Sequence, residues 1–201
     1  PQYNGNISGM IWRSTGDLVR RKYNFSYDAA NRLTAAAFNE PDFPSRGMDF
    51  SVPNLKYDAN GNIKEMDQMG WIKSSSGMID QLRYSYANTD MSNRLLNVND
   101  ISSTPVIKLG DFRTSTLHPQ FGAKSSTTVD YTYDDNGNLK KDLNKDMGNL
   151  FNDGIVYNHL NLPETVTMRN ANGVKGVITY TYSAAGVKLQ KQVADYSESG
   201  R

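Results

Sequence analysis

Histidine-based catalysis has two candidate residues in this chain, His118 and His159. His118 precedes Pro119, a position that favours extended backbone, so we expect it in a loop. His159 lies in a predicted turn. A hydrolytic triad also needs a nucleophile and a carboxylate beside the histidine, and the sequence has no Gly-x-Ser-x-Gly motif. We therefore predict that the protein is not an enzyme and assign no catalytic residue. An aspartate pair acting on a glycosidic bond stays open, because nothing in the sequence singles one out.

Two loops with the pattern Asp-x-Asn-Gly-Asn, residues 58–62 and 134–138, carry oxygen ligands of the kind that calcium prefers. An EF-hand loop has its glycine at position six and a bidentate acid at position twelve. Here the glycine is fourth, and Ile63 or Leu139 follows the loop directly. Turn formation explains this pattern better than metal binding, so we predict no metal site and no cofactor.

Trp12 and Trp71 are the residues best suited to bind a sugar ring. An exposed indole beside Asp or Asn side chains offers a flat apolar face with hydrogen-bonding groups at its edge. The alternative is that both rings pack against a β-sheet, which is the commoner fate of tryptophan in such proteins. The sequence leaves both alternatives open, and glycans therefore remain candidate partners.

Composition excludes several classes of function. The 201 residues include 22 Lys and Arg against 21 Asp and Glu, a net charge of +1, so nucleic acid is not an expected partner. The chain has no cysteine, which excludes disulfides and thiolate metal sites. No apolar run is long enough to span a membrane. The sequence begins Pro1-Gln2-Tyr3, and we expect a fragment of a longer polypeptide.

The elements that would position these residues are six similar segments, each anchored by a tyrosine. The anchoring tyrosines are spaced 30, 29, 47, 24 and 25 residues apart: Tyr27, Tyr57, Tyr86, Tyr133, Tyr157 and Tyr182. The interval of 47 indicates an insertion, which we place at residues 97–128 and interpret as a loop or an extra hairpin. Apart from this insertion, we expect residues 1–201 to form a single domain of about six repeated units.

Each unit has the pattern of one β-hairpin. Apolar and aromatic residues alternate before the turn, as in Val129, Tyr131 and Tyr133, which places them on one face of a strand. Asp begins the turn, and Gly or Asn supplies the left-handed residue. A second strand follows, led by Leu33, Ile63, Leu95, Leu139 or Leu189. The predicted turn residues are Asp28, Asn31, Asp58, Gly61, Asp134, Gly137 and Gly186.

The pattern Tyr-x-Tyr-Asp-x-x-Gly-(Asn/Arg)-Leu resembles the YD repeat of rearrangement hotspot (RHS) proteins. The segments Tyr3–Met10 and Tyr157–Pro163 are also similar to this family, so the resemblance covers nearly the whole chain except the insertion. Three units depart from the pattern, because Ala87, Asn158 and Ser183 replace the Asp after the tyrosine. These departures weaken the turn argument in those units only.

The resemblance implies a large secreted or cell-surface bacterial polypeptide. In that family, hairpin strips spiral into a hollow shell that can enclose a C-terminal toxin domain. The partners implied are the remainder of the parent polypeptide and an encapsulated toxin. Some members are described as carbohydrate-binding, which gives an alternative function for this chain.

Together these observations predict an all-β protein of sequential antiparallel β-hairpins that form one long, twisted and curled sheet. The predicted function is a non-catalytic scaffold segment of an RHS/YD-repeat surface or toxin-delivery protein, and the alternative is a carbohydrate-binding module. We expect the protein outside the cell or on its surface. The edges of an excised strip would be open to pairing, so an edge-paired dimer is a further expectation.

Overall fold

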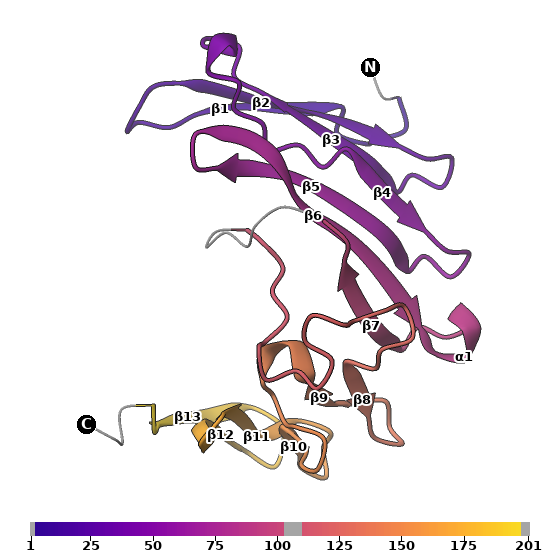
Figure 1. Cartoon of the computed structure of the whole chain (residues 1–201), viewed down its shortest axis with the longest axis vertical. Helices are drawn as coiled ribbons and strands as arrows, with labels where there is room; N and C mark the ends of the chain where they lie inside the picture. Colours follow the sequence, from indigo (N-terminus) through magenta and orange to yellow (C-terminus); the bar gives the residue numbers. More distant parts are fainter. Residues whose placement is uncertain (1–2, 103–109, 198–201) are drawn as a thin grey trace. The chain divides into compact units, whose positions relative to one another are not determined.

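A computed structural model describes residues 3–102 and 110–197 of the chain (Figure 1). Strands dominate this part of the chain, which confirms the predicted all-β class. The strands are β1 (Gly9–Arg13), β2 (Arg20–Tyr27), β3 (Leu33–Asn39), β4 (Asn54–Tyr57), β5 (Ile63–Ile72), β6 (Ser75–Tyr86), β7 (Leu95–Asp100), β8 (Tyr131–Tyr133), β9 (Leu139–Asp142), β10 (Ile155–Tyr157), β11 (Pro163–Asn170), β12 (Gly173–Tyr182) and β13 (Lys188–Asp195). Three short helical turns accompany them: α1 (Ala87–Asp90) and the 3-10 helices Pro44–Arg46 and Leu143–Lys145.

The strands pair in chain order and without crossovers, as sequential hairpins should. They form the sheets β1-β2-β3, β4-β5-β6-β7, β8-β9 and β10-β11-β12-β13. The predicted single continuous sheet is therefore divided into four. The sheet is interrupted between β3 and β4 because this segment contains Pro41, Pro44 and Pro53, which have no backbone N–H to donate to a strand ladder. In Figure 1, β5 and β6 run side by side as a long hairpin.

The chain folds into two compact units. The first contains residues 1–93 and 98–112, and the second contains residues 94–97 and 113–201. Strands β1 to β6 belong to the first unit and β8 to β13 to the second, and β7 is divided, with residues 95–97 in the second unit and residues 98–100 in the first. The hairpin repeat continues in both units.

The predicted insertion at residues 97–128 is a loop in the part that the structure describes. Residues 97–100 complete β7, so the insertion begins later than predicted. The sequence analysis predicted a strand led by Leu95 but assigned its end to the insertion, because Asn97-Val98-Asn99-Asp100 contains only one apolar residue. Residues 103–109 lie outside the described residues. Residues 110–128 contain no strand and consist of turns and extended segments.

The turns of the hairpins have the backbone geometry that their residues favour. Gly61 and Gly137 have φ of 87° and 86°, and Gly186 has φ of 81°. Asn31 takes the same place with φ of 61°. The side chain of Asp58 accepts a hydrogen bond at 2.9 Å from the amide of Asn62, four residues on. Asp28 accepts from the amides of both Ala30 and Arg32, and Asp134 accepts from that of Asn138.

A β-bulge follows each of these turns at the same place. The anchoring tyrosine is paired with the residue two positions after the left-handed residue, and the residue after that partner is left out of the ladder. The tyrosine pairs are Tyr27 with Leu33, Tyr57 with Ile63, Tyr133 with Leu139, Tyr157 with Pro163 and Tyr182 with Lys188. The predicted leader of the last second strand, Leu189, is therefore wrong by one position, because Lys188 faces Tyr182.

Each anchoring tyrosine also binds the hairpin that precedes its own. Its hydroxyl donates a hydrogen bond to a backbone carbonyl, which in five cases belongs to the first residue of the preceding second strand and in the case of Tyr27 to Ile7, just before β1. The six bonds are 2.8 or 2.9 Å long: Tyr27 to Ile7, Tyr57 to Leu33, Tyr86 to Ile63, Tyr133 to Leu95, Tyr157 to Leu139 and Tyr182 to Pro163. We call this set the tyrosine ladder.

The buried interior is small and unusually polar. Among the described residues the buried apolar side chains are Val19, Ala36, Ile79, Leu82 and Val98. The buried polar side chains are more numerous: Glu40, Asp80, Asn97, His118, Thr128, Asp130, Asp142 and Asn144. Sheets that are not covered on both faces leave most of their side chains half-buried, so hydrogen bonds must supply part of the stability that a large apolar core gives elsewhere.

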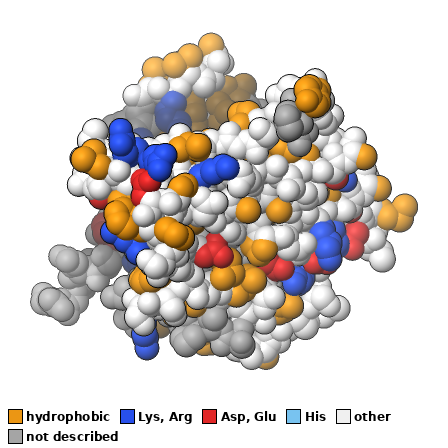
Figure 2. Space-filling model, turned by 90° about the horizontal axis from the view of Figure 1, so that it is seen from above, with side chains coloured by type: hydrophobic (Ala, Val, Ile, Leu, Met, Phe, Trp, Pro, Cys, Tyr) orange, Lys and Arg blue, Asp and Glu red, His pale blue; other side chains and the backbone are white. Residues whose placement is uncertain are grey.

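The surface seen in Figure 2 carries charges of both signs interspersed with apolar side chains. Exposed ion pairs also form in the described part of the chain, such as Arg20 with Asp42. Within the described residues, no helix has the length and apolar character that crossing a membrane requires.

The turn geometry predicts the effect of a β-branched residue at Gly137. A Cβ there would meet only the end of the Arg94 side chain, at 3.7 Å, so the cost of a substitution is backbone strain. We expect Gly137→Val to lower the free energy of unfolding by about 1–2 kcal/mol. Gly137→Asn should cost clearly less, because asparagine tolerates positive φ. Urea denaturation of both variants tests this, and equal losses would contradict the assigned strain.

The tyrosine ladder predicts the effect of removing one hydroxyl. Tyr57→Phe keeps the ring but leaves the Leu33 carbonyl without its donor. We expect a loss of about 1 kcal/mol in the free energy of unfolding, the usual net value of such a bond. Tyr3→Phe is the matched control, since Tyr3 is 93% exposed. Identical stability of Tyr57→Phe and wild type would show that the ladder contributes nothing.

Candidate functional site

A group of buried polar and charged side chains is centred on Asp130 in the second unit. Its Oδ1 lies 3.0 Å from His118 Nε2, and its Oδ2 lies 2.8 Å from Lys124 Nζ. Asn97 Nδ2 donates to the same Oδ2 at 3.3 Å. Lys124 Nζ also donates to Asn144 Oδ1 at 2.8 Å. We call these five residues the Asp130 cluster.

Neighbouring strands and turns hold the Asp130 cluster in place. The amide of Asp130 donates to the Leu96 carbonyl in β7, and the Asp130 carbonyl accepts from the amide of Leu143 after β9. His118 sits in a turn in which its amide donates to the Ser115 carbonyl. The cluster thus fixes the loop that connects β7 to β8 against the strands on either side of it.

The hydrogen bonds of His118 define its protonation. The amide of Gln120 donates to Nδ1 at 3.0 Å, so Nδ1 must be an acceptor. The ring proton is then on Nε2 and is donated to Asp130. Burial lowers the pKa of His118, which favours this neutral form. Both ring nitrogens already have protein partners, so His118 has no nitrogen available to activate a nucleophile.

Burial also shifts the pKa values of Lys124 and Asp142, two charged groups that interact with Asp130. It lowers the pKa of Lys124, against the opposing effect of Asp130, and it raises the pKa of Asp142. The side chains of His118, Lys124 and Asp130 are 1%, 6% and 0% exposed. A substrate cannot reach groups that are sealed to this degree. The cluster can therefore stabilise a loop, and it is not placed to act on a ligand.

The other histidine and the two tryptophans do not join this cluster. His159 is exposed in the turn between β10 and β11. Trp12 lies in β1, half-buried, and stacks on Tyr23 with ring centres 5.6 Å apart. Trp71 is half-buried in β5 opposite Ser76. Both indoles are half-buried, and sugar binding by Trp12 or Trp71 stays a prediction.

Three carboxylates converge in the first unit at a place that the sequence did not indicate. Side-chain oxygens of Asp80, Asp100 and Asp111 lie within 4.8 Å of one another, and Asp80 is buried. Such oxygen ligands are the kind that Ca²⁺ and Mg²⁺ take. The protein itself supplies donors, because Asp80 accepts from the amide of Phe112 and Asp100 from the amides of Gln81 and Ser102. Asp80 lies on β6, Asp100 lies 20 positions later at the end of β7, and Asp111 follows after 11 more positions in the loop. No local sequence motif therefore indicates that they come together.

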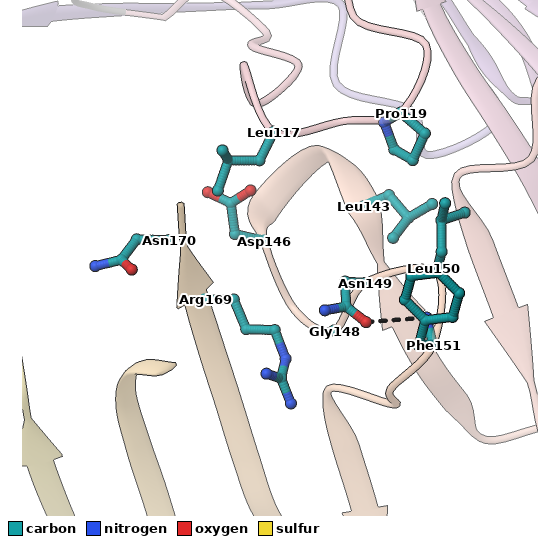
Figure 3. Close-up of a pocket in the computed structure, with 10 residues that line it drawn as sticks. All are labelled: Leu117, Pro119, Leu143, Asp146, Gly148, Asn149, Leu150, Phe151, Arg169 and Asn170. Atoms are coloured by element: carbon teal, nitrogen blue, oxygen red, sulfur yellow. Dashed lines mark hydrogen bonds between the residues drawn. The ribbon is translucent and has the colours of Figure 1, made fainter. Parts of the chain in front are cut away.

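A cavity of about 330 Å³ in the second unit is formed by the loop after β9 and the end of β11 (Figure 3). Phe151 and Leu150 are 89% and 61% exposed at its edge. Asn149 Oδ1 accepts from the amide of Phe151 and stiffens the loop. The side chains of Arg169 and Asp146 point away from each other in Figure 3. The Arg169 Nε atom is buried without a hydrogen-bond partner, so a molecule in the cavity cannot reach it.

Comparison with known proteins identifies no relative. No protein-family model matches the chain, and no curated protein matches it. The resemblance to RHS proteins therefore stays a hypothesis that rests on the repeat pattern.

The Asp130 cluster predicts a large cost for neutralising its central carboxylate. Asp130→Asn would leave the buried Lys124 ammonium without its counter-charge. We expect a loss of about 3–5 kcal/mol in the free energy of unfolding, as when one partner of a buried ion pair is removed. Asp135→Asn, at an exposed turn position, is the control and should change stability little. A similar small change for both variants would refute the structural role of the cluster.

The lowered pKa of His118 predicts how stability depends on pH. The unfolded chain takes up a proton near the ordinary histidine pKa of about 6.5, whereas the folded chain does so only at lower pH. The free energy of unfolding should therefore fall as the pH is lowered from 7.5 to 5.5. His118→Gln should remove this part of the pH dependence, and His159→Gln should leave it intact. Parallel curves for the wild type and His118→Gln would contradict the assignment.

Proposed function

We propose that this chain is a non-catalytic scaffold segment of an RHS/YD-repeat surface or toxin-delivery protein, in which it builds part of a β-hairpin shell. Its partners in this proposal are the remainder of the parent polypeptide and an enclosed toxin domain, and its location is outside the cell or on its surface. The observation that carries the proposal is the tyrosine ladder, which joins every hairpin to the one before it.

The ladder suits a scaffold because it makes each hairpin depend on its neighbour. A lone hairpin is marginally stable in water. When each unit contacts mainly the preceding and following units, stability is the sum of many similar interfaces, and the array can be extended by repetition. In a binding module, aromatic hydroxyls and polar side chains would instead be exposed and would form hydrogen bonds with a ligand.

The repeated bulges support a curved strip. Five hairpins carry a register shift at the same position beside the turn. A bulge increases the local right-handed twist and bends the strand. Five equivalent bends along one chain favour a surface that curves consistently, as the wall of a shell must.

The use of the polar residues agrees with a scaffold role. The Asp130 cluster is sealed from solvent and both nitrogens of His118 are occupied by protein groups. The Asp residues that begin the turns bind backbone amides of their own turns. These groups hold the fold together and leave little capacity for chemistry on a substrate.

The test compares the scaffold with its carbohydrate-binding alternative. The purified chain is applied to a broad glycan array, and the variants Trp12→Ala and Trp71→Ala are applied beside it. We expect no glycan to bind the wild-type chain. A glycan that binds the wild type and is lost in either tryptophan variant would replace the scaffold proposal by the carbohydrate-binding one. Incubation with glycoside substrates should give no turnover, and turnover would refute the non-catalytic assignment.

A further inference from the structure

The Asp130 cluster holds the two reactants of an amide-forming condensation in contact. The primary amine of Lys124 lies with its Nζ 2.8 Å from Oδ1 of the Asn144 side-chain amide, although the two residues are 20 positions apart. A carbonyl bond is about 1.2 Å long, so this amine is no more than about 4 Å from the Asn144 Cγ atom. Two groups that a fold holds at such a distance react as if their concentrations were very high.

The surroundings of Lys124 favour the neutral amine, which is the nucleophilic form of the side chain. The residue is buried, and burial lowers its pKa. Asp130 Oδ2 lies 2.8 Å from Nζ, which is hydrogen-bonding distance for a base that accepts the ammonium proton. His118 and Asn97 donate to the Asp130 carboxylate and hold it in position.

The Asn144 amide has a hydrogen-bond partner at each end that suits its role as the electrophile. The Thr114 hydroxyl donates to Oδ1 at 3.1 Å, where negative charge develops when an amine attacks Cγ. Nδ2, which would be the leaving nitrogen, donates to the Tyr131 hydroxyl at 3.4 Å. Asn144 is itself buried, and a buried amide is protected from competing hydrolysis by water.

We propose that Lys124 and Asn144 form an intramolecular isopeptide bond, an amide between the two side chains, with Asp130 as the general base. Asp130 takes a proton from the Lys124 ammonium, and the electron pair of Nζ then forms a bond to Cγ of Asn144. Asp130 passes the proton to Nδ2, and the bond between Cγ and Nδ2 breaks to release ammonia. Nζ loses a second proton to Asp130, and the ammonia carries this proton away as ammonium. One C–N bond forms and one breaks, so the step needs no oxidant or reductant.

The isopeptide bond fastens the loop that connects β7 to β8 to the 3-10 helix Leu143–Lys145. A covalent link of this kind restricts the unfolded chain as a disulfide does. The chain has no cysteine and therefore cannot form a disulfide. The inference depends on the Asp130 cluster alone and does not rest on the proposed scaffold function.

The mass of the intact, denatured chain tests the proposal. Release of ammonia should lower the mass by about 17 Da from that of the sequence, and digestion should yield a branched peptide that contains both Lys124 and Asn144. Condensation of Lys124 with Asp130 would instead release water and lower the mass by about 18 Da. Fragment spectra of the branched peptide identify the two linked side chains.

Variants of the whole chain assign the roles. Lys124→Arg keeps the positive charge but removes the primary amine, and it should have the full mass. Lys145→Arg is the matched control and should lose about 17 Da like the wild type, because Lys145 is exposed next to Asn144 and its Nζ donates to the Arg113 carbonyl. Asp130→Asn removes the base and should slow the reaction about 100-fold or more. Circular dichroism shows whether each variant is folded.

The wild-type mass and Lys124→Arg decide the proposal even if Asp130→Asn does not fold. The full mass in the folded wild type after prolonged incubation would overturn it, and so would a link between Lys124 and Asp130. A mass loss that persists in Lys124→Arg would place the released ammonia at another asparagine and would overturn it as well. Linkage at the wild-type rate in a folded Asp130→Asn chain would overturn the assignment of the general base.

Discussion

The hydrogen bond from a tyrosine hydroxyl to the carbonyl of the preceding hairpin is the interaction on which this architecture depends. The phenol is the natural side chain for the task, because its ring covers the neighbouring strand and its hydroxyl reaches backbone beyond the reach of serine or threonine. For five of the six bonds, the exception being the one to Leu95, the acceptor carbonyl lies two residues after a left-handed turn residue, so the turn of one hairpin determines where the tyrosine of the next one binds. The turn, the bulge and the tyrosine hydrogen bond therefore occur together at a fixed spacing in the repeat.

A scarcity of buried apolar side chains explains why these bonds matter. Five buried apolar residues are few for the described length, and the side chains that are fully buried are Asn97, Asn144, Asp80 and Asp130. Where polar groups are buried in this number, each must find a partner, since an unsatisfied one costs about 1–3 kcal/mol. In the Asp130 cluster His118, Lys124 and Asp130 find such partners, whereas Asn97 Oδ1 has none, and the turn aspartates accept from the amides of their own hairpins. Because hydrogen bonds are directional, these buried polar groups favour one arrangement of the loop and hairpins.

The sequence analysis succeeded where the relevant contacts are local. Alternation of apolar residues identified the hairpins around Tyr57, Tyr133 and Tyr182, and the Asp and Gly positions identified their turns. It failed where a strand lacks such a pattern, as in the polar end of β7. It also missed the left-handed backbone of Asn88 and Thr89 in α1, with φ of 54° and 56°. The turn after Tyr86 is longer than the others and lacks the aspartate at its start.

In the candidate sites, too, the sequence indicated single residues but not the distant residues that surround them. The sequence singled out His118, but it could not show that Asp130, Lys124 and Asn97 surround it, because contacts with Asn97 span 33 residues. The convergence of Asp80, Asp100 and Asp111 was equally invisible, and so was the half-buried environment of Trp12 and Trp71.

By itself, the sequence determined the all-β class, the hairpin repeat and most of its turns, since these follow from side-chain alternation and from the backbone preferences of Asp, Asn and Gly. The tertiary structure alone decided where the tyrosine hydroxyls bind, which polar groups are buried together and where one sheet ends and the next begins. These features depend on groups far apart in the chain, whose distances are set only when the hairpins pack against one another.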